Sequence, residues 1–243
     1  MCMSHGVGSN EATIWKAYMF ERYAIFYTPD DPGFAAFGAQ WLGWDSAAGA
    51  SVKHPVFDGL DVAELTKAPR KYGLHATLKA PFRLAEGARE EDLINAVDIF
   101  SASQPAARVE GLELAYRHGF LALRPAGNDE ELGVLAGNVV RAFEPLRAPL
   151  NETDIARRRK STLSERQDAQ MLKWGYPYVF QDFHFHMTLS GRISNLQAQN
   201  TMPILQQLVT PVAPHPFIVR SVSVMGEDAC GMFHQIHRAQ LSG

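Results

Sequence analysis

The sequence is poor in cysteine, in net charge and in long apolar runs. Only Cys2 and Cys230 are cysteines, which excludes a small disulfide-rich domain and fits a reducing cytoplasm. A formal net charge of −3 gives no general attraction to nucleic acid or a membrane, so any anion site must be built locally. No apolar run is long enough to span a bilayer, and the opening "MCMSHGVGSN" lacks the apolar core of a signal peptide. We therefore expect a cytoplasmic protein without a membrane partner, preceded by a flexible leader over residues 1–19.

The order of the expected elements indicates an α+β fold. The length of 243 residues, of which 46% are hydrophobic, is enough for one large domain or two small lobes. Periodicity and turn residues predict strands and helices that repeat in a similar order in each half of the chain. Strands are expected over residues 22–29, 73–82, 107–127 (two strands), 182–191 and 216–241 (two strands). Helices are expected over residues 31–43, 61–68, 90–100, 128–146, 151–160, 162–175 and 194–209. This order predicts a first lobe over residues 20–127, and a helical connection with a second lobe over residues 128–243.

The sequence also predicts where two helices begin and where one helix is interrupted. Thr162 and Glu165 have the spacing of a capping box, which predicts where one helix begins. Asn128 can cap the helix that follows it. Pro203 lies inside an otherwise helical pattern, where it predicts a break or a boundary.

The stretch "DFHFHMTLSG" over residues 182–191 alternates between apolar and polar side chains. Because side chains alternate across a strand, one face is apolar, while His184, His186, Thr188 and Ser190 share the other. The stretch "GLHATLKAPF" over residues 73–82 repeats this arrangement, with His75 and Thr77 on one face. One His-x-Thr strand is typical of an ordinary solvated sheet face. Two copies in matching places of two similar halves favour a shared site.

These two motifs resemble those of the two-histidine (2H) phosphoesterases, the LigT-like superfamily. The stretches "RYAIFY", "YGLHATLKAPFRL", "RAPL…RR", "WGYPYVF" and "FHFHMTLSGRI" more specifically resemble a branch of phosphonate-metabolism proteins encoded beside carbon–phosphorus lyase genes. The resemblance implies two similar lobes whose antiparallel sheets form a concave groove. His184 departs from the branch, which would have arginine there.

Paired imidazoles suit phosphodiester cleavage. One neutral histidine takes a proton from water and one cationic histidine gives a proton to the leaving oxygen. The sequence leaves open which of His75 and His186 has which role. The hydroxyls of Thr77 and Thr188 can donate to the non-bridging phosphate oxygens. This chemistry requires no cofactor and no metal, and its substrate is expected to be a small cyclic phosphodiester. The resemblance suggests a ribosyl cyclic phosphate in phosphonate metabolism. The alternative is a 2′,3′-cyclic phosphodiesterase or ligase acting on RNA ends, although nucleic acid is the less favoured partner.

Other residues are candidates for substrate contact. Lys79 would face the groove if the alternation continues past Thr77. Arg22 and the basic run over residues 157–160 could attract an anion, although such a run is more often a solvated helix face. The candidate substrate-binding residues are Lys79, Tyr23, Tyr178, His184 and Arg192.

Two other hypotheses stay open, a metal-dependent enzyme and a non-catalytic binding protein. His184 and His186 have a metal-ligand spacing and, with His75 or His234, could hold zinc or iron, but no carboxylate accompanies them. The groove could also bind a phosphate ligand without turnover. Under each of these hypotheses we expect the protein to be a monomer.

Overall fold

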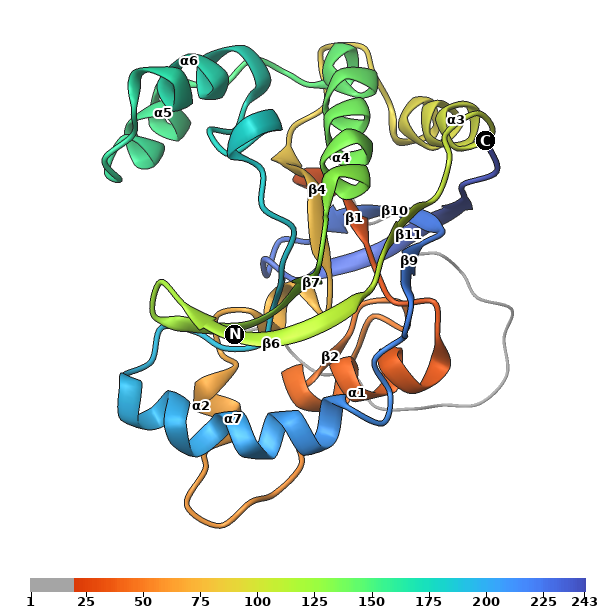
Figure 1. Cartoon of the computed structure of the whole chain (residues 1–243). Helices are drawn as coiled ribbons and strands as arrows, with labels where there is room; N and C mark the ends of the chain where they lie inside the picture. The colour runs from red at the N-terminus through yellow and green to blue at the C-terminus, as the bar shows by residue number, and fades with distance from the viewer. Residues whose placement is uncertain (1–19) are drawn as a thin grey trace, which may run out of the picture.

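The computed structural model describes residues 20–243, so the expectations for residues 1–19 lie outside the described part of the chain. Helices and antiparallel sheets alternate along it, which confirms the α+β class (Figure 1). The strands are β1 (Arg22–Tyr27), β2 (Trp44–Asp45), β3 (Ala50–Ser51), β4 (Ala76–Phe82), β5 (Ala107–Val109), β6 (Gly111–Arg117), β7 (Phe120–Ala126), β8 (Met187–Thr188), β9 (Phe217–Val219), β10 (Ser221–Glu227) and β11 (Phe233–Gln240). The α-helices are α1 (Pro32–Leu42), α2 (Val62–Leu65), α3 (Glu90–Ser101), α4 (Glu130–Ala142), α5 (Glu152–Arg158), α6 (Glu165–Trp174) and α7 (Asn195–Val209). The 3-10 helices are η1 (Arg70–Tyr72), η2 (Glu144–Leu146) and η3 (Phe180–Asp182).

Two sheets carry the two histidine motifs. The first has the strand order β11-β10-β1-β4, and the second has the order β6-β7-β8. All pairs in both sheets are antiparallel. Each sheet combines strands from both halves of the sequence, because the late hairpin β10–β11 pairs with β1 and the early hairpin β6–β7 pairs with β8. The boundary expected at residue 127 therefore separates two similar runs of elements in the sequence. It does not separate the two sheets, because each contains strands from both sides of it.

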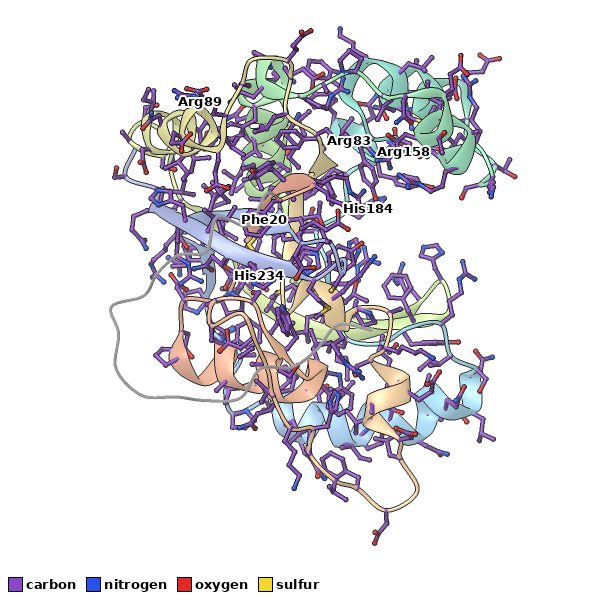
Figure 2. All side chains as sticks on the ribbon, turned by 180° about the vertical axis from the view of Figure 1, so that it is seen from behind. Phe20, Arg83, Arg89, Arg158, His184 and His234 are labelled. Atoms are coloured by element: carbon purple, nitrogen blue, oxygen red, sulfur yellow. The ribbon has the colours of Figure 1, made fainter. Side chains whose placement is uncertain are left out.

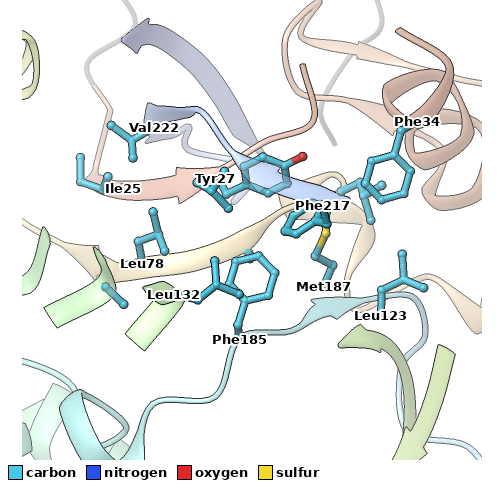
Figure 3. Packing of buried hydrophobic residues seen from close by; sticks show 14 of the residues in the cluster. Ile25, Tyr27, Phe34, Leu78, Leu123, Leu132, Phe185, Met187, Phe217 and Val222 are labelled. Carbon is cyan, nitrogen blue, oxygen red and sulfur yellow. The ribbon is translucent and has the colours of Figure 1, made fainter. Parts of the chain in front are cut away.

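A shared apolar core joins the two sheets (Figure 3). Tyr27 from the first sheet lies 5.2 Å, between ring centroids, from Phe217 of β9. Phe217 in turn lies 5.7 Å from Phe185, which precedes β8. Met187 belongs to the same cluster and is fully buried. The apolar face of the second motif is thus anchored in the core, which fixes the direction of its polar face.

Helices cover the sheets on two sides. Helix α4 stands above β4 in Figure 1, while α1 and α7 run along the other side of the molecule. Among the described residues, no helix is both long enough and apolar enough to cross a membrane.

The helix ends correct two expectations from the sequence. The capping box of α6 is formed by Ser164 and Gln167, and Thr162 is not part of it. Helix α7 continues through Pro203 without ending there, since the helix runs on to Val209. Asn128 accepts a hydrogen bond at 2.9 Å from the backbone N–H of Glu130, so it does support the start of α4.

Candidate active site

The two His-x-Thr motifs are held by different amounts of regular structure. Thr77 lies within β4 and His75 immediately precedes it. In the second motif only Met187–Thr188 form a strand, so the strand predicted over residues 182–191 is much shorter. The alternation nevertheless persists, because Phe185, Met187 and Leu189 are buried while His186 is accessible. The stretch stays bonded to β7 beyond Thr188, since the N–H of Leu189 donates to the carbonyl oxygen of Leu121 at 2.8 Å, and its apolar side chains pack in the core.

The same local hydrogen bond orients both imidazoles. Nδ1 of His75 lies 3.0 Å from the carbonyl oxygen of Gly73, and Nδ1 of His186 lies 2.8 Å from that of His184. Because a carbonyl oxygen only accepts, each Nδ1 carries the proton and donates it. Each neutral ring is therefore the tautomer whose Nε2 bears a lone pair. Oγ1 of Thr77 lies 3.2 Å from Nε2 of His75 and can donate to it.

One cavity of about 550 Å³ brings the predicted catalytic residues together. His75, Thr77, His186 and Thr188 all line it. Its other polar or charged lining residues are Arg22, Lys71, Tyr72, Arg157, Arg158, Tyr176 and Ser190. A volume of this size suits a small-molecule ligand. The two motifs are separated by about half of the sequence, and the fold brings both to the wall of this one cavity.

The cavity is strongly cationic although the whole chain is slightly acidic. Arg22, Lys71, Arg157 and Arg158 line it, and none of the carboxylates in the described part of the chain does. Such a concentration of one sign attracts an anionic ligand independently of the net charge.

Burial lowers the pKa of both histidines. The ring of His75 lies 4.2 Å from that of Phe26 and 5.2 Å from that of Tyr72, between centroids. Desolvation there is the largest cause of a pKa of about 4 for His75, and the nearby His186 contributes in the same direction. Desolvation by the cavity walls also lowers the pKa of His186, although that side chain remains accessible to water. Both rings are therefore neutral at pH 7 in the unliganded protein.

Lys79 does not face the cavity, contrary to the expectation from alternation. The pairing of β1 with β4 shifts register between Ile25–Lys79 and Phe26–Thr77, so one extra residue lies between Thr77 and Lys79. A bulge of this kind moves the following side chain to the opposite face. Lys79 is only 3% exposed, and its Nζ donates to Oε2 of Glu144 at 2.9 Å. Its role is structural.

Tyr23 and Arg192 also lie outside the cavity that the two motifs line. Tyr23 is buried and donates its hydroxyl to Oε2 of Glu90 at 3.1 Å. Arg192 lines a separate pocket beside α2 and α7. Neither is placed to contact a phosphate held by the two motifs.

Tyr178 and His184 line a second cavity, of about 450 Å³, next to the first. Thr77, Tyr176 and His186 line both cavities, so the two cavities adjoin at the His-x-Thr motifs. The second cavity is richer in rings, with Phe120 and Phe183 in its wall. These two predicted contact residues could therefore reach a substituent of a bound ligand, but they do not line the cationic cavity.

The residues that a metal site would need are dispersed. His234 is bound through Nε2 to Asp228 at 2.9 Å. His75 and His184 line different cavities. Within residues 20–243, no group of three or more histidine, cysteine, aspartate and glutamate side chains is arranged to hold a metal ion.

Several cavity residues had weak or no signal in the sequence. Arg157 and Arg158 belong to the basic run, which periodicity alone could not distinguish from a solvated helix face. Lys71 and Tyr72 lie on η1, a short element without a periodic pattern. Tyr176, within the quoted "WGYPYVF", stacks beneath the Arg158 guanidinium at 5.2 Å from the ring centroid. Only the proximity of these segments in the fold reveals them.

Comparison with known proteins places the chain in a family. The family described as "Protein of unknown function (DUF1045)" matches residues 77–234, and the chain belongs to it. The chain is 37% identical over 231 residues to the protein named "Ribose 1,5-bisphosphate phosphokinase PhnN" from Janthinobacterium sp. (strain Marseille), covering 91% of this chain and 51% of that protein. It is 34% identical over 176 residues to the protein of the same name from Laribacter hongkongensis (strain HLHK9), covering 72% of this chain and 41% of that protein. The chain thus spans about half the length of the curated relatives that it matches.

Two solved structures are similar to the chain over most of its length. One is LigT of E. coli complexed with 3′-AMP, at 14% identity and a TM-score of 0.43, covering 92% of this chain and 99% of that one. The other is TT0787 of Thermus thermophilus, at 14% identity and a TM-score of 0.43, covering 91% of this chain and 98% of that one. Both similarities combine low sequence identity with a low TM-score.

Proposed function

We propose that the chain is a metal-independent phosphoesterase that cleaves a small cyclic phosphodiester by paired-histidine acid–base catalysis. The observation that supports this most is the convergence of both His-x-Thr motifs on one cationic cavity. Each imidazole is oriented by a backbone carbonyl with Nε2 as its free nitrogen, which is the arrangement that proton transfer at Nε2 requires.

We assign the roles of base and acid from the surroundings of the two histidines. His75, with the pKa near 4, is neutral and acts as the base, and its Nε2 takes a proton from water. The water oxygen forms a bond to phosphorus while one ring P–O bond breaks. Nε2–H of a protonated His186 gives its proton to the leaving oxygen, which yields a phosphomonoester and a hydroxyl. Thr77 turns its hydroxyl from His75 to a phosphate oxygen, and Thr188 donates to another.

An anionic substrate helps to set these protonation states. Burial disfavours the cationic form of each imidazole, and a bound phosphate favours it. The substrate thus raises the pKa of His186 in the complex, so that the acid is protonated where it is needed.

The substrate class that we favour is a ribosyl cyclic phosphate. The curated relatives are named as kinases of ribose 1,5-bisphosphate, which is a phosphorylated ribose. We do not extend the kinase activity to this chain, because its sequence contains no G-x-x-x-x-G-K-S/T phosphate-binding loop. The resemblance to phosphonate-metabolism proteins points to the same class of sugar phosphate.

A second candidate is the cleavage of a 2′,3′-cyclic phosphate at an RNA end. The adjoining cavity favours it, since Phe120 and Tyr178 offer rings on which a base could stack.

Turnover of a panel of cyclic phosphates in the presence of a chelator tests the proposal. The panel should hold ribose cyclic phosphates and nucleoside 2′,3′-cyclic phosphates, with phosphate-ester products followed by phosphorus NMR. We expect turnover of at least one compound, and loss of about 10²- to 10⁴-fold in each of His75→Ala and His186→Ala. Binding without any turnover would instead support a non-catalytic phosphate-binding protein, and activity abolished by the chelator would support a metal enzyme.

A further inference from the structure

Arg158 differs from the other arginines of its segment. Arg157 donates to Oδ1 of Asp154 at 2.7 Å, and Arg159 donates to Oδ1 of Asp168 at 2.7 Å. The Arg158 side chain makes no hydrogen bond or ion pair within residues 20–243, and its Nε is buried without a partner. Figure 2 shows Arg158 on the same side of the molecule as His184.

The surroundings of Arg158 make an unpaired cation costly. Its guanidinium lies over the ring of Tyr176, and desolvation lowers its pKa. The half-buried Arg158 has the carboxylate of Asp154 nearby, but that carboxylate is already bonded to Arg83 and Arg157. An anion that binds directly to Arg158 would offset the desolvation of its charge. The side chain also lines the catalytic cavity, so a ligand of that cavity can supply the anion.

The charges of the cavity exceed what a single phosphodiester needs. A diester carries one negative charge, which the two His-x-Thr motifs can hold. Of the four cations in the wall, Arg22 is paired with Glu227 and Arg157 with Asp154. Lys71 and Arg158 form no ion pair with another described residue, and both line the same cavity. Two unpaired cations match a phosphomonoester, whose charge at pH 7 is about −1.5 to −2.

We propose that Arg158, assisted by Lys71, forms a subsite for a second phosphate group on the same substrate. The substrate is then a cyclic phosphodiester that also carries a phosphomonoester, and this proposal rests on the function proposed above. Arginine suits the task because its planar guanidinium can bind phosphate through two parallel hydrogen bonds. The cavity of about 550 Å³ has room for a pentose between the two phosphates.

A matched pair of substrates tests the subsite. One is a ribose cyclic phosphate, and the other is the same compound with a phosphomonoester on its 5-hydroxyl. We expect wild-type kcat/KM to favour the phosphorylated compound by roughly 10- to 100-fold. Arg158→Gln should reduce that ratio to within a few fold of one, and Arg158→Lys should give an intermediate ratio. The control is Arg159→Gln, which removes the same charge from a neighbouring position outside the cavity and should keep the wild-type ratio.

A binding experiment separates failure of the subsite from failure of the phosphoesterase function. Calorimetry with ribose 5-phosphate needs no turnover, and it should show affinity for the wild type that is lost in Arg158→Gln and kept in Arg159→Gln. If neither cyclic compound is turned over while this pattern holds, the phosphoesterase proposal fails and the subsite stands. If Arg158→Gln, folded by circular dichroism, retains either the substrate preference or the affinity for ribose 5-phosphate, the subsite is refuted.

Discussion

The pH dependence of kcat/KM follows from the surroundings of the two histidines. With a pKa of about 4, His75 is cationic in about one molecule in a thousand at pH 7, compared with roughly one in four at an ordinary pKa of 6.5. His75 is therefore ready to act as a base down to about pH 4. The pKa of His186 is lowered below 6.5 by desolvation, so the protonated acid is lost as the pH rises towards neutrality. The result is a bell-shaped profile with its maximum between about pH 4 and pH 6.5.

The assay is kcat/KM for a cyclic phosphodiester, measured from about pH 3.5 to pH 9. Above the maximum we expect a fall that approaches tenfold per pH unit. The profile of kcat should be displaced to higher pH, because the bound phosphate raises the pKa of the acid. The control His237→Gln removes a histidine that is bound to Asp98 and does not line the cavity, so its profile should be unchanged. A maximum at pH 8 or above would refute the reasoning.

Three further predictions concern stability, each measured by urea unfolding. Lys79→Ala should lower the free energy of unfolding by about 1–3 kcal/mol, because it removes the partner of Oε2 of Glu144 and leaves only Arg147 on that carboxylate, while kcat/KM is kept. Gly38→Ala should destabilise by about 1–3 kcal/mol, although alanine favours helices, because its Cβ would overlap the side chain of Leu74. The pKa of His75 is lowered in the folded state, so the neutral ring stabilises the fold above pH 6.5. This contribution to the free energy of unfolding is lost as the pH falls to 4. Over that range the wild type should lose roughly 2–3 kcal/mol more than His75→Asn. Equal losses, or wild-type stability of the first two variants, would contradict these assignments.

The sequence predicts most of the regular elements because they are periodic and capped. Helices α1, α3, α4 and α7 appear where apolar spacing indicates them. The four motif residues also line one cavity. The prediction of a shared site rested on the two copies in similar halves and on the resemblance, because a single His-x-Thr strand is typical of a solvated sheet face.

The errors arise where long-range pairing overrides a local pattern. Lys79 follows Thr77 by two residues, yet a bulge against β1 turns it into the interior. Local patterns also cannot predict that β10–β11 pairs with β1 and that β6–β7 pairs with β8. The first pairing joins residues about 200 positions apart in the sequence. Arg158 looks like its neighbours in the basic run. Only the fold shows that Asp154 and Asp168 pair with the neighbours and leave Arg158 unpaired.

A kinetic double-mutant cycle at His75 and His186 tests the central claim most directly. It compares kcat on a cyclic phosphodiester for the wild type, His75→Ala, His186→Ala and the double variant, with chelator present. If both rings act on one phosphate in one step, each single variant loses nearly all of the acid–base contribution, and the double variant is little slower than either. Losses that multiply in the double variant, or a single variant with near-wild-type kcat, would contradict the paired-histidine mechanism.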